Sequence, residues 1–186
     1  MNLFVLDSDP IKAAQLQCDK HVVKMIVESA QMLSTVHRML DGKEERRPSK
    51  SGKTMSKYWV LPDAREDTFY KAVHMHHPCT VWTAQSNNNY NWHWVHFAAL
   101  CDEYQYRYGK VHSTDTLLRE ALKQLPHNIP VGYKTLQPLA MKSNPECMDL
   151  NDVVGSYRKF YQTKQGRFKM AWTKRPIPEW FKVEAA

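Results

Sequence analysis

The feature that most constrains the fold is a long run of apolar residues at helical spacing near the start of the chain. Between residues 11 and 40 these side chains recur every three or four positions and cover more than half of a helix circumference. They are Ile11, Cys18, Val22, Val23, Met25, Val27, Ala30, Leu33, Val36 and Leu40. Asp9 suits the N-cap, Pro10 the first helical position and Gly42 the C-terminal stop. The pattern predicts a buried central helix from Pro10 to about Arg38.

Three further helices follow from capping residues and apolar spacing. They are expected over residues 87–108, over 114–125, and from residue 149 or 151 to 161. Residues 126–148 contain four prolines and little pattern, which is typical of a long loop. The sequence contains no alternating strand of useful length and no internal repeat. We therefore predict an all-α class: a single compact helical domain over residues 1–186, built around the buried N-terminal helix, with long loops.

Residues 43–57 lack apolar periodicity and carry six basic and two acidic residues. We interpret this stretch as a mobile basic surface loop or insertion rather than a domain boundary. Gly52-Lys53-Thr54 is similar to the end of a phosphate-binding loop, but that motif also needs a glycine five positions before Gly52. Arg47 occupies that position, which excludes the motif.

The charge balance indicates the class of partner. The chain carries a formal charge of +7 and a pI near 9.2, which favours polyanions, with nucleic acid ahead of an acidic membrane surface. No apolar run approaches the roughly 20 residues of a membrane span, and the first residues lack the pattern of a signal peptide. The four cysteines are scattered, which favours reduced thiols over disulfides. We expect a cytoplasmic protein with nucleic acid as its partner and no membrane partner; a merely basic protein is the alternative.

Four polar residues form a stripe on the predicted central helix. Intervals of three, four and three positions put them on one face. They are His21, Lys24, Glu28 and Gln31. A carboxylate near apolar walls can transfer protons, and Lys24 would keep Glu28 ionised and able to stabilise a developing cation. We predict Glu28 as the catalytic group, with His21 and Lys24 as its catalytic partners; the alternative is a solvated helix face with an ordinary ion pair.

A pocket for a planar base is predicted from aromatic, amide and basic residues. Rings stack on a base, amides read its edge and cations hold phosphate. The expected substrate-binding residues are Gln31, His76, His77, Asn89, Trp92 and Arg107. At least half of the rings in these segments are expected to belong to the core instead, among them Tyr90, Trp94 and Tyr108.

The histidine-rich run 74–77 with Cys79 has residue types that bind metals. Structural zinc sites need paired ligands at both ends of the site, and no second pair completes such a set in this sequence. His93 and His96 share one face of the second predicted helix without further ligands at the right spacing. We expect no metal and no cofactor, and histidines that hydrogen-bond to backbone or contact phosphate.

A basic run near the C-terminus is interleaved with aromatic residues. Its cations are Lys164, Arg167, Lys169, Lys174 and Arg175, with Phe168 and Trp172 among them. This composition suits contact with a phosphate backbone, and such binding falls steeply with salt. We predict that these cations bind nucleic acid; plain solvated surface is the alternative.

Several segments resemble a group of uncharacterised phage and bacterial small helical proteins. The segments are residues 18–37, 77–79, 89–92 and 103–112, spread along the chain. This resemblance implies a phage-type protein, which would act in the cytoplasm of the host.

The layout also resembles the pyrimidine-dimer DNA glycosylases of the endonuclease V type. Those are small, basic, helical proteins whose first helix carries a histidine and, seven residues on, a catalytic glutamate. His21 and Glu28 reproduce that spacing. The resemblance implies cleavage of a glycosidic bond by an amine that is exposed when the initiating methionine is removed.

Two departures from that family concern the amine and its surroundings. Asn2 disfavours removal of Met1, and the family's arginines around the glutamate are absent, with Val27 and Gln31 at those positions. A lysine of the first helix could form the imine instead. The identity of the nucleophile is therefore left open.

Three functions follow from these observations. The leading hypothesis is a phage-type DNA base-processing enzyme, either a glycosylase or a base-modifying enzyme, with its carboxylate on the first helix. The alternatives are a non-catalytic phage protein that binds nucleic acid or a host protein, and a small-nucleotide-processing enzyme. The enzyme hypothesis expects His21, Glu28, His77 and Asn89 to converge on one concave pocket.

Overall fold

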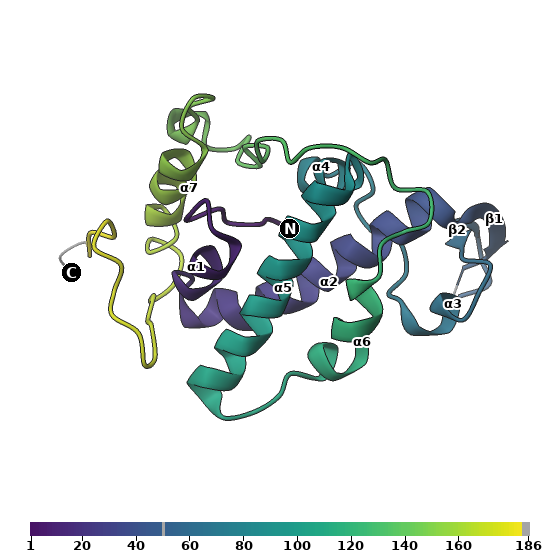
Figure 1. Cartoon of the computed structure of the whole chain (residues 1–186), viewed down its shortest axis with the longest axis horizontal. Helices are drawn as coiled ribbons and strands as arrows, with labels where there is room; N and C mark the ends of the chain where they lie inside the picture. The colour runs from purple at the N-terminus through teal and green to yellow at the C-terminus, as the bar shows by residue number, and fades with distance from the viewer. Residues whose placement is uncertain (50, 184–186) are drawn as a thin grey trace.

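The structure, a computed structural model, describes residues 1–49 and 51–183 and is mostly helical (Figure 1). Helices contain 47% of the chain and strands 7%, so the all-α prediction holds for the body of the molecule and needs one correction, a two-stranded sheet. In chain order the elements are α1 (Pro10–Gln15), α2 (Asp19–Asp41), β1 (Lys43–Pro48), β2 (Met55–Val60), α3 (Arg65–Thr68), α4 (Pro78–Ala84), α5 (Asn87–Tyr108), α6 (Ser113–Lys123), the 3-10 turn η1 (Pro145–Cys147) and α7 (Val153–Gln162).

Helix α2 lies at the centre and packs against α4, α5 and α6, as the apolar stripe predicts (Figure 1). Its fully buried aliphatic side chains include Val22, Ile26 and Leu33. Burying each such side chain contributes about 1.5–3 kcal/mol, so this helix supplies much of the stability of the core. Across it lies α5, which Ser86 caps at its N-terminus and the left-handed Gly109 ends, as predicted.

The prediction of one continuous helix from Pro10 is wrong, because the chain breaks after α1. Cys18 is extended, and the amide of Asp19 donates to the carbonyl of Ala171 rather than to a preceding turn. The indole of Trp172 donates to the carbonyl of Leu16 over 2.9 Å. The returning C-terminal segment therefore satisfies the backbone groups at the break, which periodicity alone could not reveal.

The prediction of a loop or insertion over residues 43–57 needs correction, because most of these residues belong to two regular strands. Strands β1 and β2 pair antiparallel in one register, from Lys43 opposite Val60 to Pro48 opposite Met55. Both faces of β1 are exposed, so the strand has no apolar side to produce an alternating pattern. Lys50, part of the predicted loop, lies outside the described residues.

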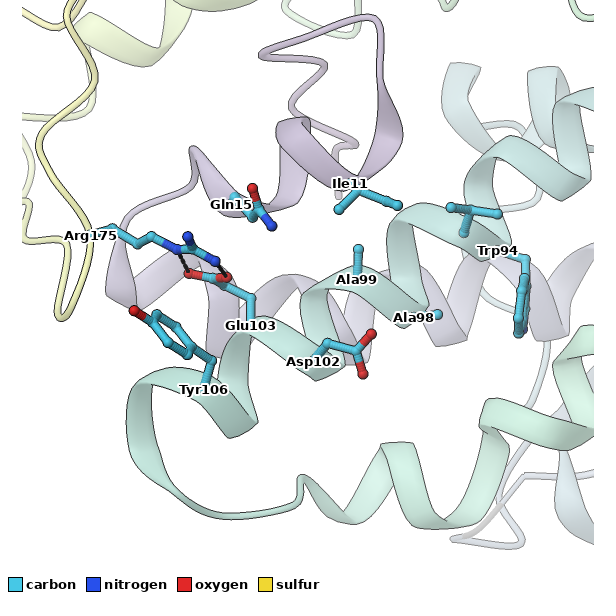
Figure 2. A pocket seen from close by; sticks show the side chains of 10 residues that line it. Ile11, Gln15, Trp94, Ala98, Ala99, Asp102, Glu103, Tyr106 and Arg175 are labelled. Atoms are coloured by element: carbon cyan, nitrogen blue, oxygen red, sulfur yellow. Dashed lines mark hydrogen bonds and ion pairs between the residues drawn. The ribbon is translucent and has the colours of Figure 1, made fainter.

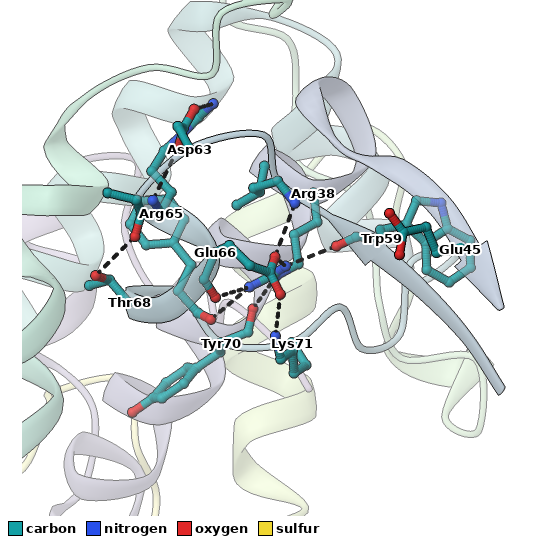
Figure 3. A network of polar contacts seen from close by, with 12 residues as sticks. Arg38, Glu45, Trp59, Asp63, Arg65, Glu66, Thr68, Tyr70 and Lys71 are labelled. Atoms are coloured by element: carbon teal, nitrogen blue, oxygen red, sulfur yellow. Dashed lines mark hydrogen bonds and ion pairs between the residues drawn. The ribbon is translucent and has the colours of Figure 1, made fainter. Parts of the chain in front are cut away.

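The hairpin formed by β1 and β2 is fixed to the body by Arg38, which is fully buried near the C-terminal end of α2 (Figure 3). Its five N–H donors all have acceptors: the carbonyls of Trp59, Glu66, Phe69 and Tyr70, and the Glu66 carboxylate. We call these residues, with Lys71 that pairs with Glu66, the Arg38 cluster. It joins β2, α3 and the segment after α3 to the central helix.

The remaining predictions of secondary structure are confirmed in outline. Helix α6 and helix α7 occupy the predicted third and fourth positions, and a long loop joins them apart from η1. All four cysteines are buried and free. Among the described residues, no helix has the length and apolarity to cross a membrane.

Candidate functional site around Glu28

The carboxylate of Glu28 lies on an edge of α2, with 14% of the side chain exposed. Its Oε1 forms an ion pair with Nζ of Lys24, one turn earlier in the helix, over 3.0 Å. The Lys24 side chain is 64% exposed, so this pair lies at the boundary between core and solvent. The predicted partnership of Lys24 with Glu28 is therefore present as a direct contact.

The other oxygen of Glu28 meets the start of the chain. The α-amino group of Met1 lies 3.6 Å from Oε2, beyond hydrogen-bond distance, and this buried oxygen has no hydrogen-bond partner among the described residues. Asn2 holds the chain there: its Oδ1 accepts the amides of Leu3 and Phe4, and its Nδ2 donates to the carbonyl of Ala140. A buried oxygen that lacks a hydrogen bond is uncommon and costs stability, so it needs an explanation.

His77, at the N-terminus of α4, lies near both Glu28 and the α-amino group of Met1. The residue precedes Pro78 and is extended, and its Nδ1 accepts the amide of Cys79 over 3.2 Å. The neutral ring therefore carries its proton on Nε2. Burial lowers the pKa of His77, and the nearby α-amino group of Met1 lowers it further, whereas the Met1 backbone and Glu28 oppose the shift. We call Met1, Lys24, Glu28 and His77 the Glu28 site.

An open hollow of about 670 Å³ adjoins the Glu28 site through His77. Its lining residues are Trp59, Ala72, His74, Met75, His76, His77 and Pro78. The segment that forms it runs along α2, where the hydroxyl of Thr35 bonds to both backbone groups of Val73. His74 has a left-handed backbone (φ 50°), which costs about 1–2 kcal/mol for a residue other than glycine. Such strain is concentrated at functional sites.

His21 shares the helix face of Glu28 but lies among aromatic rings. Its ring stacks on Phe4 at 4.5 Å, and its Nδ1 bonds to the hydroxyl of Tyr161 over 2.7 Å. Burial lowers its pKa to about 4, and Lys24 and Lys164 lower it in the same direction. The structure thus gives His21 a neutral, packed role beside the Glu28 site and no contact with Glu28.

The predicted base-pocket residues are only partly brought together. His76 and His77 line the hollow, and Gln31 is half-buried on the same helix as Glu28. Asn89 is fully buried and bonds to Thr135 and the carbonyl of Trp82, which fixes the long loop. Convergence of Asn89 with Glu28 is therefore a prediction that the structure does not support.

Two further predicted residues have structural partners and do not line the hollow. Trp92 is buried, stacks on His96 and donates to the carbonyl of Ser8. Arg107 is buried and bonds to Glu103 and Asp19. Their types suit a binding pocket, but their donors are used within the core.

The predicted C-terminal cations differ in their freedom to bind phosphate. Arg167 and Lys169 are exposed. Lys164 is 7% exposed with its ammonium 3.4 Å from the ring centre of Phe160, and burial lowers its pKa to about 8. The ammonium of Lys174 donates to the carbonyl of Tyr106. The prediction that all five cations bind phosphate needs correction for Lys164 and Lys174, whose ammonium groups have partners within the protein.

Arg175 closes one end of a different cavity, of about 300 Å³, between α1 and α5 (Figure 2). Its guanidinium donates to both oxygens of Glu103, over 3.0 and 2.8 Å, and Glu103 also accepts from Arg107. The floor is formed by Ala98 and Ala99 (Figure 2). The Glu103 carboxylate at this cavity is already compensated, which leaves it less suited to chemistry than Glu28.

The sequence pattern identified Glu28 and its lysine, and the residue types identified His77. It did not identify the contact of the Met1 amine with Glu28, because that contact joins residues 27 positions apart and depends on how the first six residues are buried. No group of three or more potential metal ligands occurs in the part of the chain that the structure describes.

Comparison with known protein families, with curated proteins and with solved structures gave no match to this chain.

Proposed function

We propose that the protein is a DNA base-processing enzyme of the glycosylase type, with Glu28 as its catalytic carboxylate. The observation that carries the proposal is the buried Oε2 of Glu28, which lacks a hydrogen bond and lies 3.6 Å from an amine. An amine beside a carboxylate is the pair that attack on a sugar carbon requires. The net charge of +7 supports a polyanionic substrate.

The proposed reaction begins when Glu28 takes a proton from the neighbouring ammonium. The free amine then forms a bond to C1′ of the deoxyribose, and the bond between C1′ and the base breaks with its electron pair leaving on the base. Glu28 returns its proton to the departing base. The ring oxygen O4′ then leaves C1′ as a hydroxyl and takes the second amine proton, which produces an imine.

The carboxylate has a second role in this scheme. Cleavage of a glycosidic bond passes through a cation-like sugar, and an ionised carboxylate stabilises that charge. Lys24, at 3.0 Å from Oε1, places a positive charge beside the carboxylate throughout. His77, whose ring also interacts with the Met1 backbone, lines the edge of the hollow where the sugar or base would lie.

The test is the substitution Glu28→Gln, assayed on duplex oligonucleotides that each carry one modified base or one abasic site. We expect turnover to fall roughly 100- to 10,000-fold while binding to the same duplex is retained. Glu120→Gln, an exposed glutamate on α6, is the matched control and should keep full turnover. A Glu28→Gln protein that retains full activity on a processed substrate would refute the proposal.

A second candidate, binding of a host protein, is favoured by one observation on the long loop. Val131, Tyr133 and Leu136 are 90%, 92% and 70% exposed, although side chains at the start of α5 fix the loop backbone. Exposed apolar groups on a fixed backbone suit a protein partner. This candidate expects Leu136→Ser to abolish function and Glu28→Gln to have no effect.

A further inference from the structure

The hairpin of β1 and β2 extends from the body at the C-terminal end of α2 (Figure 1). Each strand has six residues, which span about 20 Å. A two-stranded hairpin is marginally stable by itself in water. Here the Arg38 cluster fixes its base, since Arg38 donates to the carbonyl of Trp59 and the amide of Leu61 donates to Glu66 (Figure 3). The fold thus holds a ribbon that contributes little to the core.

Two cations on this ribbon are placed so that their repulsion destabilises the strand pair. Arg46 lies directly opposite Lys57, and like charges in opposite positions of a strand pair destabilise it. Glu44 pairs with Lys57 over 2.9 Å, whereas Arg46 has no acidic partner among the residues described. Lys53 adds a further exposed cation at the turn. A polyanion laid on this face would remove the repulsion.

The charged face leads toward the Glu28 site. Side chains two residues apart in a strand share a face, so Trp59 lies on the same face as Lys57. Trp59 lines the hollow together with His77, which belongs to the Glu28 site. At the far side of Glu28, α2 carries the exposed Lys20 and Lys24.

We propose that the hairpin is an arm that enters a groove of duplex DNA, with Arg46, Lys53 and Lys57 on its phosphates. The major groove of B-form DNA is about 12 Å wide and admits a two-stranded ribbon. The duplex then continues past Trp59 and presents its backbone to the hollow. This inference rests on the proposed function for its choice of DNA and adds that the substrate is double-stranded.

The test measures binding to an undamaged 24-base-pair DNA duplex as a function of salt. One variant carries Arg46→Gln, Lys53→Gln and Lys57→Gln. The matched control carries Lys12→Gln, Lys159→Gln and Lys182→Gln, three exposed cations on α1, α7 and the C-terminal segment. Loss of three phosphate contacts lowers the slope of log affinity against log salt by about 2.7, and the control should change it by less than about 1.

Three results would overturn the inference. The hairpin variant could keep the wild-type slope, both variants could lose the same slope, or single-stranded DNA or duplex RNA of the same length could bind as tightly as duplex DNA. A hairpin variant that aggregates but binds as before would show that the charges only prevent pairing of strand edges. Glu28→Gln, tested in the same way, should bind like wild type. The activity assay therefore tests the catalytic proposal, and the salt dependence of binding tests the role of the hairpin separately.

Discussion

Two polar side chains on the same helix, Arg38 and Glu28, differ in whether their buried polar atoms have hydrogen-bond partners. Arg38 is fully buried and each of its five N–H groups has an acceptor. Glu28 is partly buried, with 14% of its side chain exposed, but one of its oxygens is buried and accepts no hydrogen bond within the described residues. A satisfied group stabilises the fold, whereas an unsatisfied one reduces stability and stays available to a ligand. The comparison indicates a structural role for Arg38 and supports the proposal that Glu28 is a functional group.

The largest expected effect on stability belongs to Arg38. Arg38→Met leaves Glu66 without its buried cation and leaves several carbonyls unpaired, which should cost about 3–5 kcal/mol of unfolding free energy. Urea unfolding measures this loss. Lys71→Met removes the exposed partner of the same carboxylate and should cost less than about 1 kcal/mol. Equal costs for the two variants would contradict the assignment of Arg38.

The next effect is a loss of stability in mild acid, to which both ends of α2 contribute. Burial lowers the pKa of His21, near Glu28, to about 4 and that of His37, near Arg38, to about 3. Unfolded histidines titrate near 6.5, so below that pH the unfolded chain binds more protons and stability falls as pH falls.

At pH 5 each of these histidines should have reduced the unfolding free energy by about 2 kcal/mol relative to neutral pH. The loss begins near pH 6.5 and continues toward the folded pKa values. Urea unfolding at pH 7 and pH 5 measures it. A stability that stays constant across this interval would show that the two rings are protonated in the folded protein.

The smallest effect on stability is expected at Glu28. Glu28→Gln removes a carboxylate whose Oε2 accepts no hydrogen bond within the described residues, but it also removes the charge that faces Lys24 and the Met1 ammonium. These effects oppose each other, so the unfolding free energy should change by less than about 1 kcal/mol, in either direction. Thermal unfolding beside Arg38→Met makes the comparison directly. If the Glu28 variant loses as much stability as the Arg38 variant, the distinction between the two sites is wrong.

How much of the fold and of the candidate site could be predicted from the sequence depends on which interactions are local. The central helix, its end at Gly42 and the pairing of Lys24 with Glu28 follow from residue spacing along one helix, whereas the break before Asp19 does not. The hairpin does not, because β1 buries no side chain and has no alternating pattern. Its base instead depends on Arg38, a charged residue whose five acceptors come from distant segments.

The candidate site shows the same limit. Residue type alone favoured Asn89, Trp92 and Arg107 as binding groups, but the fold uses their hydrogen bonds to fix the long loop and the N-terminal segment. The amine near Glu28 depends on the buried path of residues 1–6, which has no periodicity to read. Only a three-dimensional arrangement reveals which polar groups are left without partners.

The most direct measurement is to trap the proposed imine. A duplex with one abasic site, which presents an aldehyde, is incubated with the protein and reduced with borohydride, and the adduct is located by peptide mass spectrometry. We expect a covalent adduct on the peptide that carries the α-amino group of Met1, and no adduct with Glu28→Gln. Absence of any adduct with wild type, or equal yields for the two proteins, would contradict the assignment of Glu28 as the carboxylate that activates an amine.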